Sequence, residues 1–176
     1  MSLYIETNFY PNDTDQELLN FVFSNDFSWF FDYAEKDINK YGLFYHLLMK
    51  RNIENSDNIG TINSPYFKGF KDIFLKICKD NKIDVNVIHR AAINRTYHFA
   101  EKYGHIHKDH TFPHKQLIWY WNDFTDAPTY IFDEEENIMK TTSVGKNKVS
   151  IFDNQYHAQG FCAPGETRIA VIFTFN

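Results

Sequence analysis

Three side chains of the sequence have the types and the spacing to bind a metal ion. His107 and Asp109 are separated by one residue, and a second histidine, His157, follows in a later segment. Residues two apart on a β-strand project from the same face, so we expect the side chains of His107 and Asp109 to point toward one place. Two histidines and one carboxylate bind one face of an octahedral Fe(II) ion and leave the other positions open. The set therefore predicts a redox-active iron site.

An arginine near the C-terminus has the chemistry to bind the anionic end of a second molecule. Arg168 follows His157 in an apolar segment, and the chain has only four arginines. A guanidinium group forms bidentate hydrogen bonds with a carboxylate. We therefore expect Arg168 to hold the carboxylate of a molecule that also reaches the metal.

This order, His-x-Asp, a distant His and then an Arg, resembles the Fe(II)/2-oxoglutarate-dependent oxygenases. It is most similar to their prolyl 4-hydroxylase-like branch and to its small phage and bacterial homologues. The segment Trp119-Tyr120-Trp121-Asn122 resembles a Tyr-Tyr-Leu-Asn strand of that branch. The resemblance implies Fe(II) on His107, Asp109 and His157, 2-oxoglutarate on Arg168 and Tyr120, and O2 as the oxidant.

The resemblance implies an activity as well as a site. A member of this class hydroxylates a C–H bond and releases succinate and CO2 from 2-oxoglutarate. The implied substrate is a peptidyl proline, and a small molecule or another type of side chain stays open. Tyr97 and Asn94 are rival candidates for a further contact with 2-oxoglutarate.

Two features depart from the family pattern. Asp126-Ala127-Pro128-Thr129 stands where prolyl hydroxylases have a Gly-Gly pair. His105 has the same alternation as His107, so a shifted set of ligands that uses His105 stays open.

The elements that must position these side chains are mainly β-strands. Seven short segments with strand-like patterns and turn-rich connections are typical of a sandwich or barrel. They are 84–92, 104–110, 116–122, 129–133, 138–144, 148–153 and 167–175. We expect an α+β fold: a double-stranded β-helix, or jelly-roll, with N-terminal helices packed on one sheet. One oxygenase domain would span 1–176, with helical support in 1–83 and the β-helix core in 84–176.

The N-terminal half gives weaker signals. We expect an extended arm or strand in 1–12, a helix capped by Thr14, a strand in 41–49, and a loop in 51–63. A second helix is predicted to begin at Ser64-Pro65, since Ser is a good N-cap and Pro suits the first helical position. The aromatic residues between Phe27 and Tyr33 are expected to pack in the core.

In the two best-patterned strands, alternate residues separate an apolar face from a mixed one. The apolar faces begin with Leu117 and Ile169 and should pack under the helices. The mixed faces, with Tyr120 and Arg168, should line the interior of the barrel.

Composition excludes several classes. The net charge of −5 gives no overall attraction for nucleic acid. We find no secretory signal and no run of apolar residues that would span a membrane, so we expect a cytoplasmic protein. Cys78 and Cys162 are too far apart in sequence for a Cys-x-x-Cys metal pair and are expected to stay reduced.

Three other functions stay open. A cupin-like metal dioxygenase would keep the fold but would not use 2-oxoglutarate, which leaves a buried Arg168 without an anion. In a non-catalytic jelly-roll binding module, the three ligands would point apart. A structural zinc site is disfavoured because no regularly spaced fourth ligand is visible.

Overall fold

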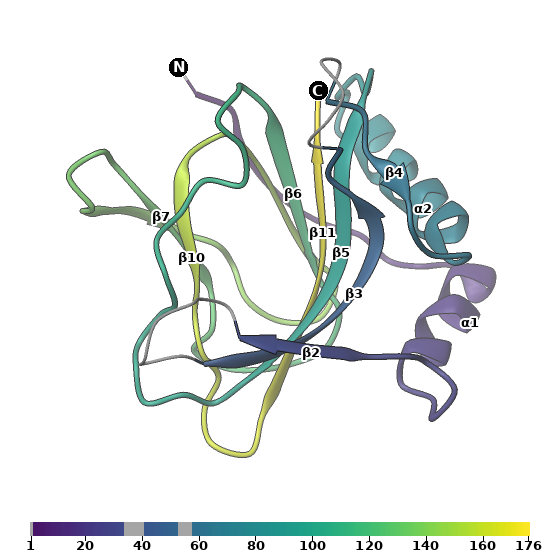
Figure 1. Cartoon of the computed structure of the whole chain (residues 1–176), viewed down its shortest axis with the longest axis horizontal. Helices are drawn as coiled ribbons and strands as arrows, with labels where there is room; N and C mark the ends of the chain where they lie inside the picture. Colours follow the sequence, from purple (N-terminus) through teal and green to yellow (C-terminus); the bar gives the residue numbers. More distant parts are fainter. Residues whose placement is uncertain (1, 34–40, 53–57) are drawn as a thin grey trace.

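The computed structural model describes residues 2–33, 41–52 and 58–176, and two facing antiparallel β-sheets dominate it (Figure 1). The helices are α1 (Asp13–Val22) and α2 (Phe67–Asp80). The strands are β1 (Tyr4–Asn8), β2 (Phe30–Tyr33), β3 (Gly42–Lys50), β4 (Thr61–Ile62), β5 (Ile88–Tyr97), β6 (Lys115–Tyr120), β7 (Thr129–Phe132), β8 (Ile138–Thr141), β9 (Lys148–Asp153), β10 (Tyr156–Gln159) and β11 (Thr167–Phe175).

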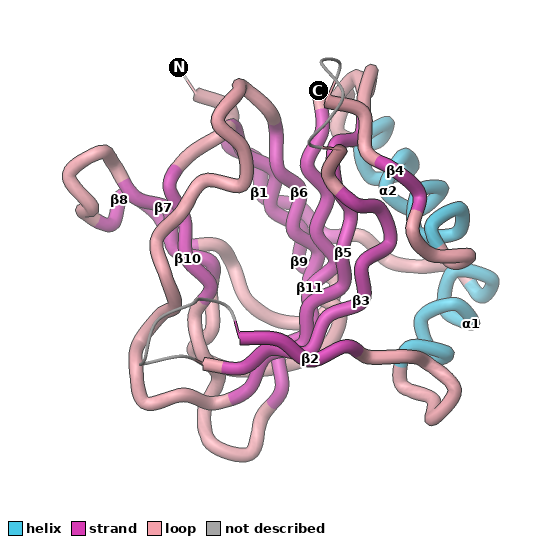
Figure 2. Tube along the Cα trace, viewed as in Figure 1, coloured by secondary structure: helices cyan, strands magenta, loops and turns pink. Residues whose placement is uncertain are grey.

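The two sheets have the arrangement of a double-stranded β-helix. The larger sheet has the order β1-β9-β6-β11-β5-β3-β2, with β4 paired to β3, and the smaller has the order β10-β7-β8. All the described strand pairs are antiparallel. Figure 2 shows the smaller sheet facing the larger one, with both helices outside the larger sheet. The predicted fold class is confirmed.

The helices and the larger sheet share an apolar core. Phe74 of α2 stacks on Phe173 of β11 with their ring centroids 4.3 Å apart, and Phe70 meets the ring of Trp121 edge-on. Leu19 of α1 is buried in the same cluster. Burying one such side chain contributes about 1.5–3 kcal/mol, so this layer fixes the sheet that carries part of the site.

Alternation along β11 separates this core from the interior between the sheets. Ile169, Val171 and Phe173 belong to the core shared with the helices. Arg168 and Ile172, from the other face, line a cavity between the sheets. The predicted division of this strand into an apolar and a mixed face matches the structure.

The helix starts differ from the prediction. Asn12 caps α1 instead of Thr14, because its side-chain oxygen accepts the backbone N–H of Asp15 at 2.8 Å. Helix α2 begins at Phe67, because the Ser64 hydroxyl accepts the N–H of Tyr66 within a turn before the helix. That hydroxyl also pairs with His46.

Two predictions from the aromatic and loop segments need correction. Phe30 and Phe31 are each 52% exposed and are not core residues, because β2 forms the edge of the larger sheet. The predicted loop 51–63 contains the short strand β4, and residues 53–57 of it lie outside the described part. The strand predicted in 41–49 is present as β3.

The predicted strand 104–110 is absent. The segment between β5 and β6 is a long loop whose backbone forms two isolated bridges, Tyr103 with Gly160 and His107 with His157. Two separate bridges do not form the continuous ladder of a strand. The strand in 84–92 is shifted and runs as β5 from Ile88 to Tyr97.

Among the described residues, neither helix has the length and apolar character that crossing a membrane would require.

Candidate active site

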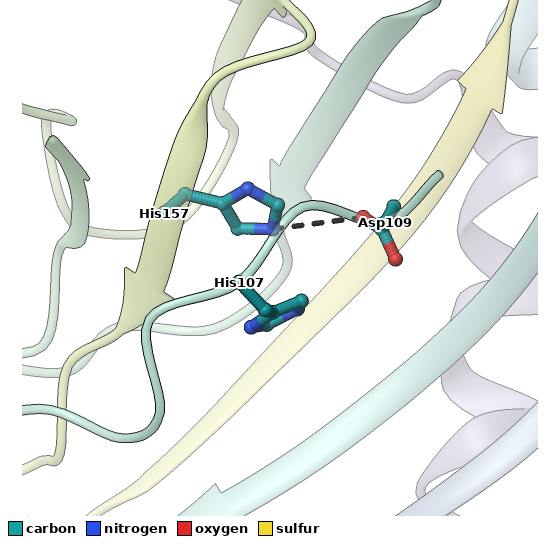
Figure 3. A group of neighbouring side chains, drawn as sticks. All are labelled: His107, Asp109 and His157. Atoms are coloured by element: carbon teal, nitrogen blue, oxygen red, sulfur yellow. Dashed lines mark ion pairs between the residues drawn. The ribbon is translucent and has the colours of Figure 1, made fainter. Parts of the chain in front are cut away.

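The three predicted metal ligands come together between the sheets. His157 lies in β10 of the smaller sheet, and His107 and Asp109 lie in the loop between β5 and β6. The backbones of His107 and His157 exchange two hydrogen bonds, of 3.0 and 2.9 Å, which hold the two residues opposite each other. Figure 3 shows the two imidazoles and the carboxylate converging.

The spacing of these groups suits one metal ion. One nitrogen from each imidazole and one carboxylate oxygen all lie within 4.8 Å of one another. His157 Nε2 is 3.5 Å from Asp109 Oδ2, and both side chains are only 6% exposed. Within the described residues this is the one group of three or more His, Cys, Asp or Glu side chains that converges in this way.

Backbone carbonyls orient both imidazoles. His107 Nδ1 donates to the carbonyl of His105 at 3.0 Å, and His157 Nδ1 donates to that of Gln155 at 3.0 Å. A proton on each Nδ1 leaves the Nε2 lone pair for a metal, which is the usual way that proteins fix a histidine ligand. In this structure the Gln116 side-chain amide lies 3.3 Å from His157 Nε2.

Two arginines stabilise the carboxylate of Asp109. Arg51 Nη2 donates to Oδ1 at 2.7 Å, and Arg90 Nη1 is 3.7 Å from the same oxygen. Burial opposes ionisation, but Arg90, the two histidines and Arg51 together hold the pKa of Asp109 well below its ordinary value. Asp109 is therefore ionised at neutral pH, and its other oxygen faces His157.

His157 is kept neutral. Burial lowers its pKa to about 4, although the Asp109 carboxylate acts in the opposite direction. A neutral imidazole is the form that binds a metal, so this ligand needs no deprotonation near pH 7.

Arg168 lies in the same interior with most of its donors unused. Its residue is 1% exposed, and Nη2 donates to the Thr129 hydroxyl at 3.0 Å. Nε and Nη1 are buried without a hydrogen-bond partner in the structure. An isolated buried cation is costly, so two unused donors on a buried guanidinium favour an anionic ligand.

Tyr120 lies behind Arg168 rather than on the cavity wall. Its hydroxyl pairs with the Thr129 and Thr142 hydroxyls at 2.9 and 2.7 Å. Its ring lies under the Arg168 guanidinium, 4.9 Å from the guanidinium carbon to the ring centroid. Tyr120 thus contacts Arg168 with its ring and Thr129 with its hydroxyl, and its role in 2-oxoglutarate binding stays a prediction.

A cavity of about 380 Å³ connects the metal ligands to Arg168. Its lining residues are Tyr41, Leu43, Arg51, Arg90, Asn94, His105, His107, Asp109, Gln116, Ile118, Thr129, His157, Gln159, Arg168 and Ile172. One cavity therefore holds both a candidate metal site and a candidate carboxylate site.

The remaining candidates separate clearly. Asn94 lines the cavity and its side-chain oxygen is buried without a partner, whereas Tyr97 is 38% exposed and packs under Arg95. His105 lines the cavity but is not part of the converging group. Cys162 is buried in an apolar cluster, and burial raises the pKa of its thiol to about 11.

Sequence reasoning missed the residues that surround the ligands. Arg51, Arg90, Gln116 and Thr129 all line the cavity, and none was predicted there. The sequence did offer an indication for Arg90. It is an even number of residues from Asn94, so the two share one face of β5, and arginine is rare in this chain. Arg51 reaches the site from the end of β3, which no sequence pattern indicates.

Comparison with known proteins gives a fold and no close relative. No family model matches the sequence, and no curated protein matches it. Among solved structures, a 2OG-Fe(II) oxygenase family oxidoreductase from Burkholderia pseudomallei has a TM-score of 0.72 at 10% identity, covering 98% of this chain and 84% of that one. A Pseudomonas putida prolyl-4-hydroxylase has a TM-score of 0.57 at 12% identity, covering 98% and 91%.

A prolyl hydroxylase from Trichoplax adhaerens, solved with a peptide fragment of hypoxia inducible factor, is also similar. Its TM-score is 0.58 at 12% identity, and the match covers 98% of this chain and 82% of that one. The chain thus has the double-stranded β-helix fold of the Fe(II)/2-oxoglutarate oxygenases. At this fold level the resemblance inferred from the sequence is confirmed.

Proposed function

We propose that this protein is an Fe(II)- and 2-oxoglutarate-dependent dioxygenase that hydroxylates a C–H bond and releases succinate and CO2. One observation carries the proposal. Arg168, a buried guanidinium with two unpartnered nitrogens, shares a cavity with a converging His-Asp-His group. That combination fits a co-substrate that binds the metal at one end and carries a carboxylate at the other.

Each residue has a role that follows from its surroundings. His107, Asp109 and His157 would hold the iron, with both imidazoles oriented by backbone carbonyls. Bound iron supplies the activation of O2 that side chains alone do not provide. Arg168 binds the far carboxylate of 2-oxoglutarate, and Thr129 positions the guanidinium.

The proposed substrate is a peptidyl proline. The prolyl hydroxylase-like order of the site residues supports this choice, and so does the similarity to the Trichoplax adhaerens prolyl hydroxylase bound to a peptide. A small molecule is the other substrate class that the cavity admits.

The two alternative functions fit the site less well. A cupin-like dioxygenase without 2-oxoglutarate would leave Arg168 buried and without an anion. A non-catalytic module gives no reason for two imidazoles and a carboxylate to converge.

The test is turnover by the purified protein with Fe(II), 2-oxoglutarate and ascorbate. We expect succinate to form, and proline-containing peptides to raise its rate and to gain the mass of one oxygen atom. His107→Ala should abolish both signals. Succinate formation with no peptide oxidised would reject the proline assignment alone, and no succinate under any condition would reject the oxygenase.

A further inference from the structure

A second hollow extends the cavity along the larger sheet. It is a groove of about 450 Å³ lined by Asp32, Leu43, Tyr45, Leu47, Lys50, Arg51, Arg90 and Asn94. Four of these residues, Leu43, Arg51, Arg90 and Asn94, also line the cavity. A molecule lying in the groove along β3 and β5 would therefore reach the metal ligands past Arg51 and Arg90.

The residues that line the cavity, some of which also line the groove, include more arginines than carboxylates among the described residues. Three of the four arginines in the chain, Arg51, Arg90 and Arg168, line the cavity, and among the described residues that line it Asp109 is the one carboxylate. This concentration stands out in a protein whose net charge is −5. The cavity therefore attracts anions even though the whole molecule does not.

Of the two arginines beside Asp109, Arg90 is the less tightly paired. Its side chain is 21% exposed, and its single ion pair, to Asp109 Oδ1, is 3.7 Å long. That distance is too long for a hydrogen bond, and the same oxygen already accepts Arg51 at 2.7 Å. Burial also lowers the pKa of the Arg90 guanidinium. A largely buried fork of donors facing the cavity thus lacks an acceptor within the described residues.

Loading the site would leave this charge uncompensated. Asp109 would be a metal ligand, and the two negative charges of 2-oxoglutarate would balance the two positive charges of the iron, with one carboxylate bound to Arg168. Arg51 and Arg90 would then share a single carboxylate that the metal also uses. An anionic group on a molecule in the groove would reach both guanidinium groups, because Arg51 and Arg90 line the groove as well as the cavity.

We propose that the substrate carries an oxyanion, a carboxylate or a phosphate, which binds the Arg90 guanidinium with the help of Arg51. The planar fork of arginine donors matches both kinds of oxyanion. The proposal rests on the proposed function, because it takes Asp109 as an iron ligand and Arg168 as the anchor of 2-oxoglutarate. It narrows the substrate to molecules or peptide segments with an acidic group near the C–H bond that reacts.

The test uses small probes and protein loaded with Mn(II), a redox-silent substitute for Fe(II), and saturated with 2-oxoglutarate. The probes are N-acetylglycine, methyl phosphate and the neutral N-acetylglycinamide, each with a methyl signal that bound Mn(II) broadens in NMR spectra. We expect at least one anionic probe to show a relaxation enhancement about fivefold larger than that of the neutral probe. The anionic probe with the larger enhancement shows whether the site prefers a carboxylate or a phosphate.

Two arginine variants make the test specific. Arg90→Gln, compared with the wild type at saturating Mn(II) and 2-oxoglutarate, should remove the difference between anionic and neutral probes. Arg95→Gln is the matched control, since Arg95 is on the same strand but packs over Trp29 and Tyr97 on the opposite face. It should leave the difference unchanged.

The outcomes separate this proposal from the proposed function. Equal enhancement by all probes, or an unchanged difference in Arg90→Gln, would overturn the oxyanion site. A tenfold loss of 2-oxoglutarate affinity in Arg90→Gln would assign Arg90 to the co-substrate and overturn it as well. Failure of the wild-type protein to bind 2-oxoglutarate would reject the proposed function, and the probes with Mn(II) alone would then decide whether Arg90 binds an oxyanion.

Discussion

At the scale of single residues, burial and partner count distinguish Arg168 from the other cations. Its guanidinium is buried with two unpartnered nitrogens, whereas Arg95 has one such nitrogen and lies over two aromatic rings outside the cavity. Charge-assisted hydrogen bonds in a site shielded from water are worth about 1.5–3 kcal/mol each. Most of the affinity for the far end of 2-oxoglutarate should therefore depend on this one residue.

Substitution of Arg168 tests that dependence. Arg168→Gln should weaken 2-oxoglutarate binding to the Mn(II) protein by about a hundredfold, since the substitution removes a charge and paired hydrogen bonds. Isothermal titration calorimetry measures the change. Arg95→Gln is the control and should bind as tightly as the wild type, and a loss of less than threefold in Arg168→Gln would contradict the assignment.

The Thr129 hydroxyl should act through Arg168. Thr129→Val removes the acceptor of Arg168 Nη2 at nearly constant volume, so we expect about tenfold weaker 2-oxoglutarate binding with unchanged Mn(II) affinity. Thr125→Val, at an exposed threonine that bonds Glu166, is the matched control. Equal affinities in the two variants would show that Thr129 does not position the guanidinium.

Residue types and order in the sequence singled out His107, Asp109, His157 and Arg168 as candidate site residues, and the structure brings all four to one cavity. The position of Tyr120 was not predictable, because its hydroxyl is used by Thr129 and Thr142, which are distant in sequence from Arg168. Arg90 and Arg51 were missed because their pairing with Asp109 depends on the tertiary fold.

At the scale of elements, the site depends on a loop held between two rigid strands. Asp109 lies in the segment between β5 and β6, which is anchored to β10 by the bridge between His107 and His157. Strand β11 is kept in place by α2, whose Phe74 is 1% exposed and stacks on Phe173. Helix packing on the outside of the sheet therefore fixes Arg168 on its inside.

Shortening one side chain of α2 measures how much the packing of the helix on the sheet contributes to stability. Phe74→Ala should lower the free energy of unfolding by about 3–5 kcal/mol, because it leaves a cavity between the helix and the sheet. Leu75→Ala, at a neighbouring position that is 39% exposed, should cost less than about 1 kcal/mol. Urea unfolding followed by circular dichroism gives both values, and similar losses would contradict the packing described here.

Strong periodicity made the later elements predictable. Strands β9 and β11 have the predicted bounds, because each has a clear apolar pattern with polar or turn residues on both sides of it. The predicted strand 104–110 was wrong, since alternation of residue types cannot show that only two bridges would pair it. The predicted N-cap of α1, Thr14, was two residues too late. Asn12 and Thr14 are both of a type that caps helices well, so the sequence does not decide between them.

At the scale of the whole molecule, two histidines in the segment before β6 couple stability to pH. Burial lowers the pKa of His114 and lowers that of His110 to about 3, and their rings are 4.7 Å apart. An unfolded histidine has a pKa near 6.5, so the unfolded chain binds more protons than the folded one below that pH. Stability from these neutral histidines is therefore present above about pH 6.5 and declines as the pH falls.

Unfolding of the metal-free protein tests this coupling. We expect the free energy of unfolding to fall by at least about 1 kcal/mol between pH 7 and pH 5. The decrease should be smaller in His114→Gln, which cannot gain the proton. A stability that is equal at the two pH values in the wild type would show that these histidines are not held neutral by the fold.

The fold class was predictable at this scale from the count and patterning of the β segments, whereas most of the residue pairs that meet between the two sheets were not. Which residues meet between the sheets depends on contacts such as the bridge from His107 to His157, far apart in the chain. The charge surplus of the cavity likewise appears only once Arg51, Arg90 and Arg168 are brought together. Net charge alone indicated no anion site.

The most direct test of the central claim is calorimetric binding of 2-oxoglutarate with and without Mn(II). The account predicts that 2-oxoglutarate binds only when Mn(II) is present, and that His157→Ala loses the metal and with it the co-substrate. Binding of 2-oxoglutarate that is equally tight without metal, or Mn(II) binding that survives His157→Ala unchanged, would contradict the assignment of His107, Asp109 and His157 as the metal site.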